Sequence, residues 1–358
     1  MIPLRTIAML LVLTTADFAS AGEPLRKIAI DTGSSTKIHC SPDGERIVIS
    51  PRNGYCVYDL KRDRWINVGQ SVVQAVFVSN EEVACFGGGT RYGEIIRVSD
   101  QSRKSWGERL ENGYWSFRAG VLARVEVPSD DNRWLVDVRR WDAIAPQCRI
   151  KLKPAGLFRD VTLSQDGKLV AAVTGQEGIE DIRADIFNAM NGELLQSFVA
   201  SSNVFSHELT PCCYSHADFG LGGDVIVLAG EASGLVGMSE RYESVVQAFD
   251  RKTRKERWNH HSAFLRIARM KASLKGRFLA VVVIDVGDEV RLYDMQGARH
   301  RHAIRIFDML TGREIALLTG MTTQAFDIEF DPTETFVYGL AGRDPHLYVW
   351  DLRQSERP

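Results

Sequence analysis

The sequence has few cysteines and no excess of charge of either sign. Six cysteines occur among 358 residues, too few for a dense disulfide framework to hold the fold. The 44 Lys and Arg residues nearly balance the 46 Asp and Glu residues, so the formal net charge is −2. Such a chain lacks the long-range positive field that attracts nucleic acids, and we expect no nucleic-acid partner. A hydrophobic content of 44% predicts a globular protein with its own core.

Long hydrophobic runs are also missing. The longest apolar stretch in the body of the chain, 278–284, has the length of a strand, whereas a bilayer-spanning helix needs roughly 20 apolar residues. The first residues have the pattern of a secretory signal, with a basic Arg5, an apolar run over 7–13 and small residues at Ala19 and Ala21. We predict cleavage after Ala21 and a secreted or periplasmic protein without a transmembrane segment.

Motifs of the common enzyme classes are absent or stand in the wrong context. The chain has no Gly-x-Ser-x-Gly elbow, no His-Glu-x-x-His, no phosphate-binding glycine loop and no EF-hand loop. Ser34-Ser35-Thr36-Lys37 fits Ser-x-x-Lys, but that motif needs its serine at the start of a helix, and this segment joins two predicted strands. The sequence therefore favours a non-catalytic role and implies no cofactor.

The strongest positive feature is an internal repeat of apolar strands and tight polar turns. In each copy the third predicted strand ends in an aromatic or aliphatic residue followed by Asp or a polar substitute. The seven endings are Tyr58-Asp59, Val98-Ser99, Trp141-Asp142, Phe187-Asn188, Phe249-Asp250, Phe307-Asp308 and Trp350-Asp351. Their spacing is 40 to 46 residues, apart from two intervals of 62 and 58. Four-stranded units of this length cannot bury both faces alone and pack on one another as propeller blades.

Hairpin turns recur at matching places in the repeat, where glycine supplies the positive φ of a tight turn. The turns after first strands end in Gly44, Gly167 and Gly276, and those after third strands contain Gly192 and Gly312. Helical periodicity is hardly visible. We predict an all-β fold, a single seven-bladed β-propeller of four-stranded antiparallel blades.

The predicted domain organisation is a signal peptide over 1–21 and one propeller over 22–358. The expected blades span approximately 32–70, 71–110, 111–153, 154–200, 201–260, 261–320 and 321–358. The last blade has only three predicted strands before the chain stops. We expect residues 26–30 to supply its fourth strand, because this pairing satisfies an open strand edge and closes the ring.

At these residues the chain resembles the WD-repeat family of β-propellers, part of a superfold shared with YVTN and quinoprotein propellers, in an exported bacterial form. Trp141-Asp142 and Trp350-Asp351 match the family's defining dipeptide. The family's Gly-His dipeptide is missing, and Ser99 and Asn188 replace the Asp in two blades. The unit over 248–258 is similar to the docking repeat of pyrroloquinoline-quinone propellers. The resemblance implies the fold, which serves many unrelated functions.

Candidate binding residues follow from the loop lengths. Turns between first and second and between third and fourth strands are short and share one face, which we call the short-turn face. The remaining connections are long, share the opposite long-loop face, and include 201–211, 231–244 and 285–303, the last as a loop or an extended hairpin. Long loops on a rigid scaffold commonly carry binding residues. The candidates on this face are His207, His216, Trp134, Tyr242, Asp285, Arg299, His300, His302 and His346.

Histidines on this face, with carboxylates such as Asp218 and Glu231, would suit a metal or acid–base site, but no pair has an established ligand spacing. Export makes a vicinal disulfide between Cys212 and Cys213 chemically allowed, and two free thiols are the alternative.

The sequence is compatible with two functions. The first is an exported, monomeric, non-catalytic scaffold that binds a protein or an envelope component through the long-loop face. The alternative is a propeller-type enzyme, either a quinone-dependent dehydrogenase or a metal-assisted, lactonase-like hydrolase.

Overall fold

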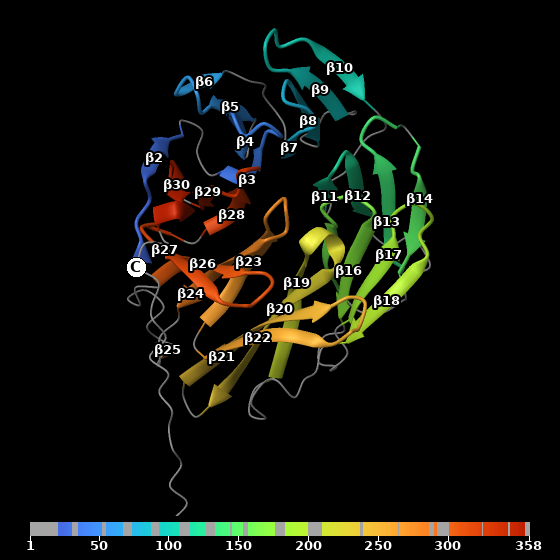
Figure 1. Ribbon diagram of the computed structural model, residues 1–358, viewed down its shortest axis with the longest axis vertical. Coiled ribbons are helices and arrows are strands. Elements are labelled where there is room, and N and C mark those ends of the chain that lie inside the picture. Colours follow the sequence, from blue (N-terminus) through green and yellow to red (C-terminus); the bar gives the residue numbers. More distant parts are fainter. Residues whose placement is uncertain are drawn as a thin grey trace, which may run out of the picture.

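Seven antiparallel sheets stand in a ring around a central channel in a computed structural model of the chain (Figure 1). The structure describes residues 21–30, 35–51, 55–66, 74–86, 93–106, 115–126, 133–143, 145–152, 157–175, 183–199, 210–236, 239–263, 265–285, 290–291, 301–323, 325–342 and 344–354. Each sheet is one blade, with its first strand nearest the channel. The predicted all-β, seven-bladed propeller is confirmed.

Blades 1 to 4 each contain four consecutive strands, which follow one another from the innermost outward. Blade 1 contains β3 (Ser35–Cys40), β4 (Arg46–Pro51), β5 (Cys56–Asp59) and β6 (Arg64–Ile66). Blade 2 contains β7 (Gln74–Phe77), β8 (Glu82–Phe86), β9 (Gly93–Arg97) and β10 (Arg103–Trp106). Blade 3 contains β11 (Trp115–Arg118), β12 (Val121–Glu126), β13 (Leu135–Arg140) and β14 (Cys148–Lys151). Blade 4 contains β15 (Leu157–Leu163), β16 (Leu169–Gly175), β17 (Arg183–Asn188) and β18 (Leu194–Val199).

Blades 5 to 7 carry the additions to the regular pattern. Blade 5 contains β19 (Thr210–Gly220), β20 (Val225–Val236), β21 (Ser239–Asp250) and β22 (Glu256–Ala263). Blade 6 contains β23 (Leu265–Ala272), β24 (Phe278–Asp285), β26 (Arg301–Asp308) and β27 (Glu314–Leu318). Blade 7 contains β28 (Ala325–Phe330), β29 (Phe336–Ala341), β30 (His346–Asp351) and β2 (Arg26–Ala29). The helices of the described part are two short 3-10 turns, η2 (Leu221–Gly223) and η3 (Leu352–Gln354), and no helix there has the length and apolar character of a membrane crossing.

The N-terminal strand closes the ring, as the sequence predicts. β2 runs antiparallel to β30, with Arg26 opposite Val349, and the Ile30 N–H donates to the Pro345 carbonyl. A second pairing was not predicted. β1 (Ala21–Gly22) lies parallel to β27 in blade 6, and the Thr319 N–H donates to the Gly22 carbonyl at 3.0 Å. The residues preceding β2 therefore also contact a second blade.

The 231–244 segment, expected as a long loop, instead continues the β20–β21 hairpin as far as Val236 opposite Ser239. Part of the 285–303 insertion forms β25 (Val290–Arg291), which leaves blade 6 and pairs with Ser239 and Glu240 of β21. The two enlarged blades are thereby joined on the long-loop face.

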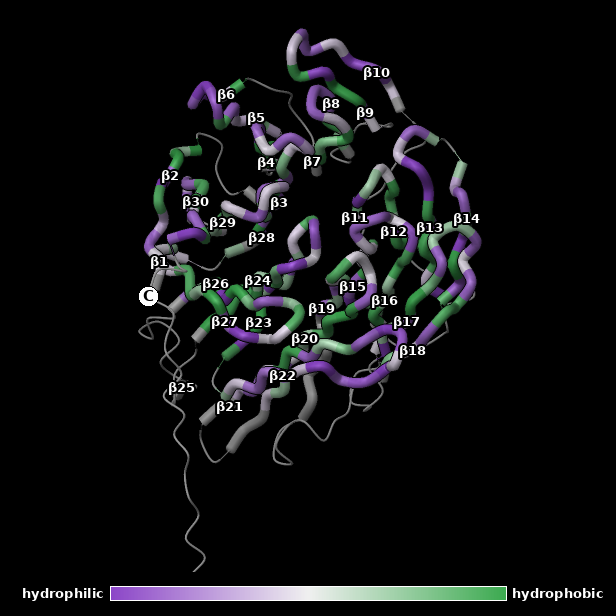
Figure 2. The backbone as a smooth tube through the Cα atoms, in the orientation of Figure 1, coloured by the Kyte–Doolittle hydropathy of each residue, from purple (hydrophilic) through white to green (hydrophobic). Residues whose placement is uncertain are grey.

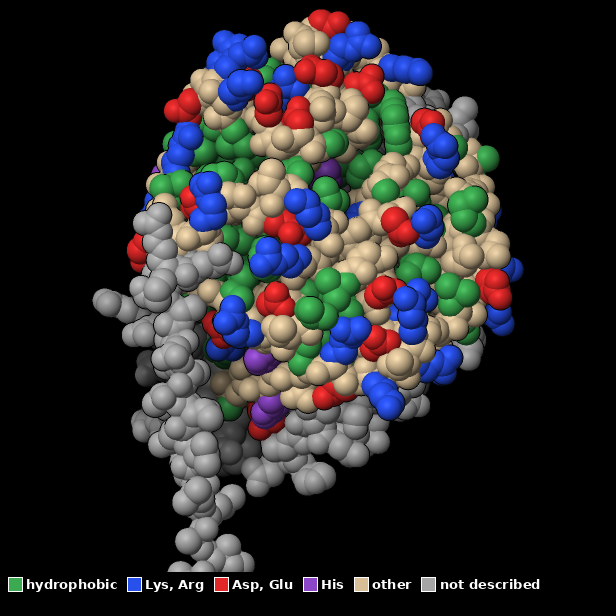
Figure 3. All heavy atoms as spheres, in the orientation of Figure 1, with side chains coloured by type: hydrophobic (Ala, Val, Ile, Leu, Met, Phe, Trp, Pro, Cys, Tyr) green, Lys and Arg blue, Asp and Glu red, His purple; other side chains and the backbone are tan. Residues whose placement is uncertain are grey.

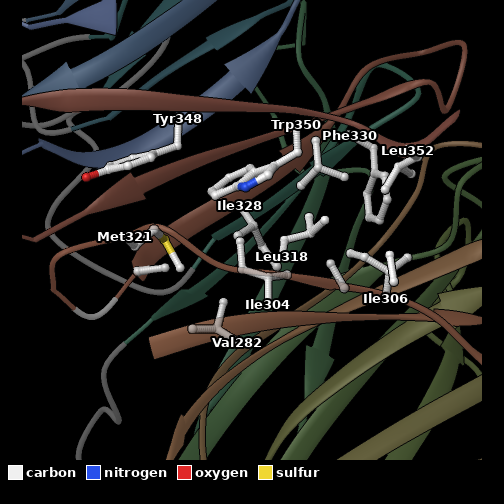
Figure 4. Close-up of a cluster of buried hydrophobic side chains, with 14 of the residues drawn as sticks. Val282, Ile304, Ile306, Leu318, Met321, Ile328, Phe330, Tyr348, Trp350 and Leu352 are labelled. Atoms are coloured by element: carbon white, nitrogen blue, oxygen red, sulfur yellow. The ribbon is translucent and has the colours of Figure 1, made fainter. Parts of the chain in front are cut away.

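Seven hydrophobic clusters hold the described part of the ring together, one at each junction between neighbouring blades. The aromatic or aliphatic residue of each repeat ending belongs to one of these clusters or packs against it, which explains why the repeat retains such a side chain there. Between blades 6 and 7, Trp350 stacks on Tyr348 with ring centroids 5.7 Å apart, and its Nε1–H donates to the Thr319 carbonyl at 3.1 Å (Figure 4). The hydropathy-coloured backbone shows the same division, with apolar strands joined by polar turns (Figure 2).

The polar residue after that aromatic closes the next turn. Asp308 accepts hydrogen bonds from the Leu310 and Thr311 N–H groups, and Asp250 accepts one from Thr253. Gly44 and Gly312 adopt φ of 74° and 72°, which confirms the predicted role of glycine in the turns. Local turn chemistry and packing between blades thus account for the repeat signature.

Candidate binding site in the central channel

The innermost strands direct alternate side chains into the channel, because successive residues of a strand point to opposite faces. Five of these strands contribute two polar residues each. They are Lys37 and His39 from β3, Asp160 and Thr162 from β15, His216 and Asp218 from β19, Arg269 and Lys271 from β23, and Asp327 and Glu329 from β28. Blades 2 and 3 supply mainly Val76, Trp115 and Phe117. The channel is therefore polar on most of its circumference and apolar on the rest.

Two adjoining cavities occupy the channel. The channel cavity, about 370 Å³, is lined by Lys37, Trp115, Asp160, His216 and Arg269, among others. The turn-side cavity, about 500 Å³, lies towards the short turns and is lined partly by residues of those turns. Four residues line both and stand where the two cavities meet: His39, Phe117, Arg118 and Lys271. Figure 3 shows a hollow near the middle of the visible face, with basic and acidic side chains interspersed around it.

Asp218 is the most extensively bonded carboxylate in the channel. It accepts hydrogen bonds from Arg118 Nη2 at 3.0 Å, Thr162 Oγ1 at 3.0 Å and the Ala272 N–H at 2.7 Å. These partners come from blades 3, 4 and 6, while Asp218 itself is in blade 5. One buried carboxylate therefore ties four blades together, and its charge is balanced by the Arg118 guanidinium.

Other channel carboxylates also bind the backbone of the next blade. Asp327 accepts the Ile38 N–H at 3.0 Å and lies 3.5 Å from Arg269 Nε, and Asp160 accepts the Ala217 N–H at 3.2 Å. Burial opposes ionisation of Asp327, but the charges of Lys37, Lys271 and Arg269 outweigh it and lower the pKa of this carboxyl. Asp327 is thus a buried anion held by cations and by a backbone donor.

The two channel histidines differ in their surroundings. His39 Nδ1 accepts the Phe77 N–H at 3.3 Å, which leaves the ring proton on Nε2. Burial lowers the pKa of His39 to about 4, so its imidazole is neutral at pH 7. His216 lies farther towards the long-loop face, with Nδ1 3.8 Å from Asp160. His39 therefore serves as a neutral acceptor between blades, whereas His216 lies beside a carboxylate.

Lys37 lies in the channel cavity between blades 7 and 2. Burial lowers the pKa of its ammonium group; the Asp327 charge opposes this effect, and the Arg269 and Lys271 charges add to it. Within the described residues, no hydrogen bond or ion pair is found for its ammonium group.

The candidates from the sequence do not assemble into one site. His216 lies in the channel. Trp134 and Tyr242 do not line the channel cavity. Trp134 stands just before β13, as expected outside a strand, and packs on Phe158 in the blade 3–4 cluster, with ring centroids 5.6 Å apart. Tyr242, expected in a loop, is in β21 with the Arg266 guanidinium 5.2 Å from its ring. His346 begins β30 beside Asp344, in blade 7. These side chains therefore belong to separate parts of the ring.

The remaining candidates fall partly or wholly outside the described residues. His302 lies in β26. Asp285 ends β24, and Cys212 and Cys213 are in β19, but their side chains are not among those described, and His207, Arg299 and His300 lie outside the described residues. None of the other four cysteines, Cys40, Cys56, Cys85 and Cys148, is joined in a disulfide. Among the described residues, no group of three or more His, Cys, Asp or Glu side chains is arranged to hold a metal ion.

Most of the channel lining was missed at the level of sequence, although a signal for it exists. Polar residues stand two and four positions before the first turn in several blades, as in Lys37-x-His39-x-Ser41 and Asp160-x-Thr162-x-Ser164. An innermost strand that alternates polar residues in this way faces a polar space on one side. The pattern marks the channel better than loop length does.

Comparison with known proteins gives the fold but no family. No family model matches the sequence, and no curated protein matches it. Among solved structures, the chain is similar to a chain of Kuenenia stuttgartiensis hydrazine synthase, with a TM-score of 0.61 and 13% sequence identity. The match covers 90% of this chain and 97% of that one. At this identity the likeness shows the fold alone.

Proposed function

We propose that this chain is an exported, monomeric, non-catalytic binding scaffold of the WD-repeat-like type, and that a protein or envelope component docks on the long-loop face of blades 5 and 6. The observation that carries this proposal is the junction of the two enlarged blades. β20 and β21 have 12 residues each. Their hairpin extends past the pair Ala232–Glu243, which is the level at which the pairing of β21 with β22 ends opposite Ala263. β25 from blade 6 then pairs with the extension.

An extension fixed by strand pairing from two blades presents a preformed surface. A preformed surface loses little conformational entropy on binding, which favours recognition of a partner. The channel carboxylates support the non-catalytic part of the proposal, because Asp218 and Asp327 are committed to neighbouring blades and to buried cations.

A shortened hairpin tests the docking surface. Ala232 and Glu243 lie opposite each other, so joining them through Asn-Gly, in place of 233–242, gives a two-residue hairpin and removes the contact with β25. Affinity capture from an extracytoplasmic extract should recover a partner with the intact chain and lose it with the shortened one. The control is Lys252→Ala, an exposed change on the short-turn face of the same blade. If the shortened chain retains every partner, the docking surface is elsewhere.

Export has its own test. N-terminal sequencing of protein from the extracytoplasmic fraction should begin at Gly22, and the Gly22 carbonyl that accepts the Thr319 N–H would then be retained. A chain recovered intact from the cytoplasm would contradict export. Metal analysis and an absorbance spectrum of the same sample address the enzyme alternative, since a stoichiometric metal or a chromophore above the aromatic band would favour it.

A further inference from the structure

The cations of the channel are not equally matched by anions. Arg118 lies 3.0 Å from Asp218, Arg269 lies 3.5 Å from Asp327, and Lys271 lies 2.6 Å from Glu329. Lys37 is the fourth cation that lines the channel cavity, and no described residue forms a hydrogen bond or ion pair with its ammonium group. Among the described residues, the channel cavity therefore has one ammonium group whose N–H donors its walls do not use.

An unmatched cation in such a place is costly. Withdrawing an ammonium group from water costs several kcal/mol in proteins unless a partner compensates. The nearby Asp327 compensates only in part, because its oxygens bind the Ile38 N–H and lie beside Arg269. An anion that entered the cavity and bound Lys37 Nζ would restore the lost solvation with a charge-assisted hydrogen bond.

The rest of the lining restricts what that anion is. Asp160 and Asp327 also line the channel cavity and would repel a second negative charge. Val76, Trp115 and Phe117 supply an apolar wall for an organic body. The volume of about 370 Å³ lies within the range of roughly 300–1,000 Å³ of small-molecule sites.

We propose that the channel cavity binds one small organic monocarboxylate, with its carboxylate on Lys37 Nζ and its apolar body against Trp115 and Phe117. This site is separate from the blade 5–6 docking surface and goes beyond the function proposed above. Inorganic anions offer the charge without an apolar body, and amides offer the body without the charge. Both are therefore expected to bind more weakly than the matching carboxylate.

Isothermal titration calorimetry on the full ring tests this with butyrate and benzoate, butyramide and benzamide, and inorganic phosphate. At least one carboxylate should bind with a stoichiometry of one, and its amide should not saturate. Lys37→Met keeps the length of the side chain and removes its charge, so carboxylate binding should weaken by about tenfold or more. Lys168→Met, which breaks only the exposed pair with Asp166, should bind as the unchanged chain does.

A second measurement uses the unsubstituted protein and does not depend on how Lys37→Met folds. Acetic anhydride labels accessible amines, and mass spectrometry quantifies acetylation of Lys37 and Lys168. The bound carboxylate should protect Lys37 and leave Lys168 unprotected. The proposal is overturned if neither carboxylate binds, if the amide or phosphate binds as tightly, if binding persists in Lys37→Met, or if Lys37 is labelled equally with and without the carboxylate. These outcomes are distinct from a failure of partner capture, which concerns the blade 5–6 hairpin.

Discussion

Removal of the closing strand is the perturbation for which the structure gives the clearest magnitude. β2 buries Ile28, and the next buried residue is Ile30; their exposed fractions are 7% and 4%, in the cluster between blades 7 and 1. Full burial of such side chains contributes about 1.5–3 kcal/mol each. Arg26 and Ala29 add hydrogen bonds to Tyr58 and Trp65 of blade 1 at 2.7 and 3.1 Å, each contributing about 1 kcal/mol.

The sum is about 5 kcal/mol or more, which is comparable to the whole stability of many domains, about 5–15 kcal/mol. A chain that begins at residue 32 should therefore melt far below a chain that begins at residue 22. Ile28→Ala alone should cost about 2–5 kcal/mol through the lost transfer energy and the cavity left behind.

Differential scanning calorimetry of the two chains, with urea unfolding of the point variants, measures both effects. The matched control is Leu25→Ala, because Leu25 precedes the strand and is 53% exposed, so the change should stay within about 0.5 kcal/mol. Equal midpoints for the chains beginning at 22 and at 32 would show that residues 22–31 do not stabilise the ring. An Ile28→Ala variant as stable as Leu25→Ala would also contradict the assigned role of this cluster.

Three further changes are expected to have measurable effects. Burial lowers the pKa of His39 to about 4, so the unfolded state takes up the proton first as the pH falls. The free energy of unfolding should therefore decrease between about pH 6.5 and about pH 4. In urea titrations, His39→Asn should flatten this pH dependence. Asp218→Asn leaves the Arg118 charge unpaired and should lower the free energy of unfolding by about 3–5 kcal/mol. Adding Arg118→Met should restore part of this loss, and strictly additive effects in the double-mutant cycle would contradict the coupling. Gly339→Ala places a Cβ 2.8 Å from the Trp350 ring, and this overpacking should lower the free energy of unfolding by about 1–3 kcal/mol. Unfolding monitored by fluorescence measures the change, and an unchanged stability would show that the ring can move aside.

The repeat and the ring closure could be predicted from sequence because they depend on local chemistry. A glycine in a two-residue turn, and an aromatic followed by Asp at the end of a third strand, each have one dominant structural meaning. Trp350-Asp351 shows both parts: the indole enters the blade 6–7 cluster, and the carboxylate accepts the Arg353 N–H. Arg26–Ala29 was predictable as the closing strand because blade 7 has only three strands from its own segment, and its open outer edge needs a fourth.

The site was harder to predict because its parts are distant in sequence. Arg118 and Asp218 are separated by 100 positions, and nothing local to either residue specifies the other. The blade 5–6 connection was hard to predict for a related reason. The two residues of β25 are too few to give a strand signal of their own, and they form a strand only by pairing with the edge of β21. Trp134 was named as a binding residue because its own segment is a polar connection on the long-loop face, whereas its partner Phe158 comes from the next blade.

The need to satisfy open strand edges explains much of the acidic part of the channel lining, and three of the four cations pair with those carboxylates or with Glu329. Each innermost strand has an edge that no further strand covers, so its N–H groups need other acceptors. Asp327, His39, Ser116, Asp160 and Asp218 each accept such an N–H from a later blade around the ring. An ammonium group cannot accept a hydrogen bond, so Lys37 cannot take part in this arrangement. Its charge helps to keep Asp327 ionised, whereas a bound carboxylate would also use its N–H donors.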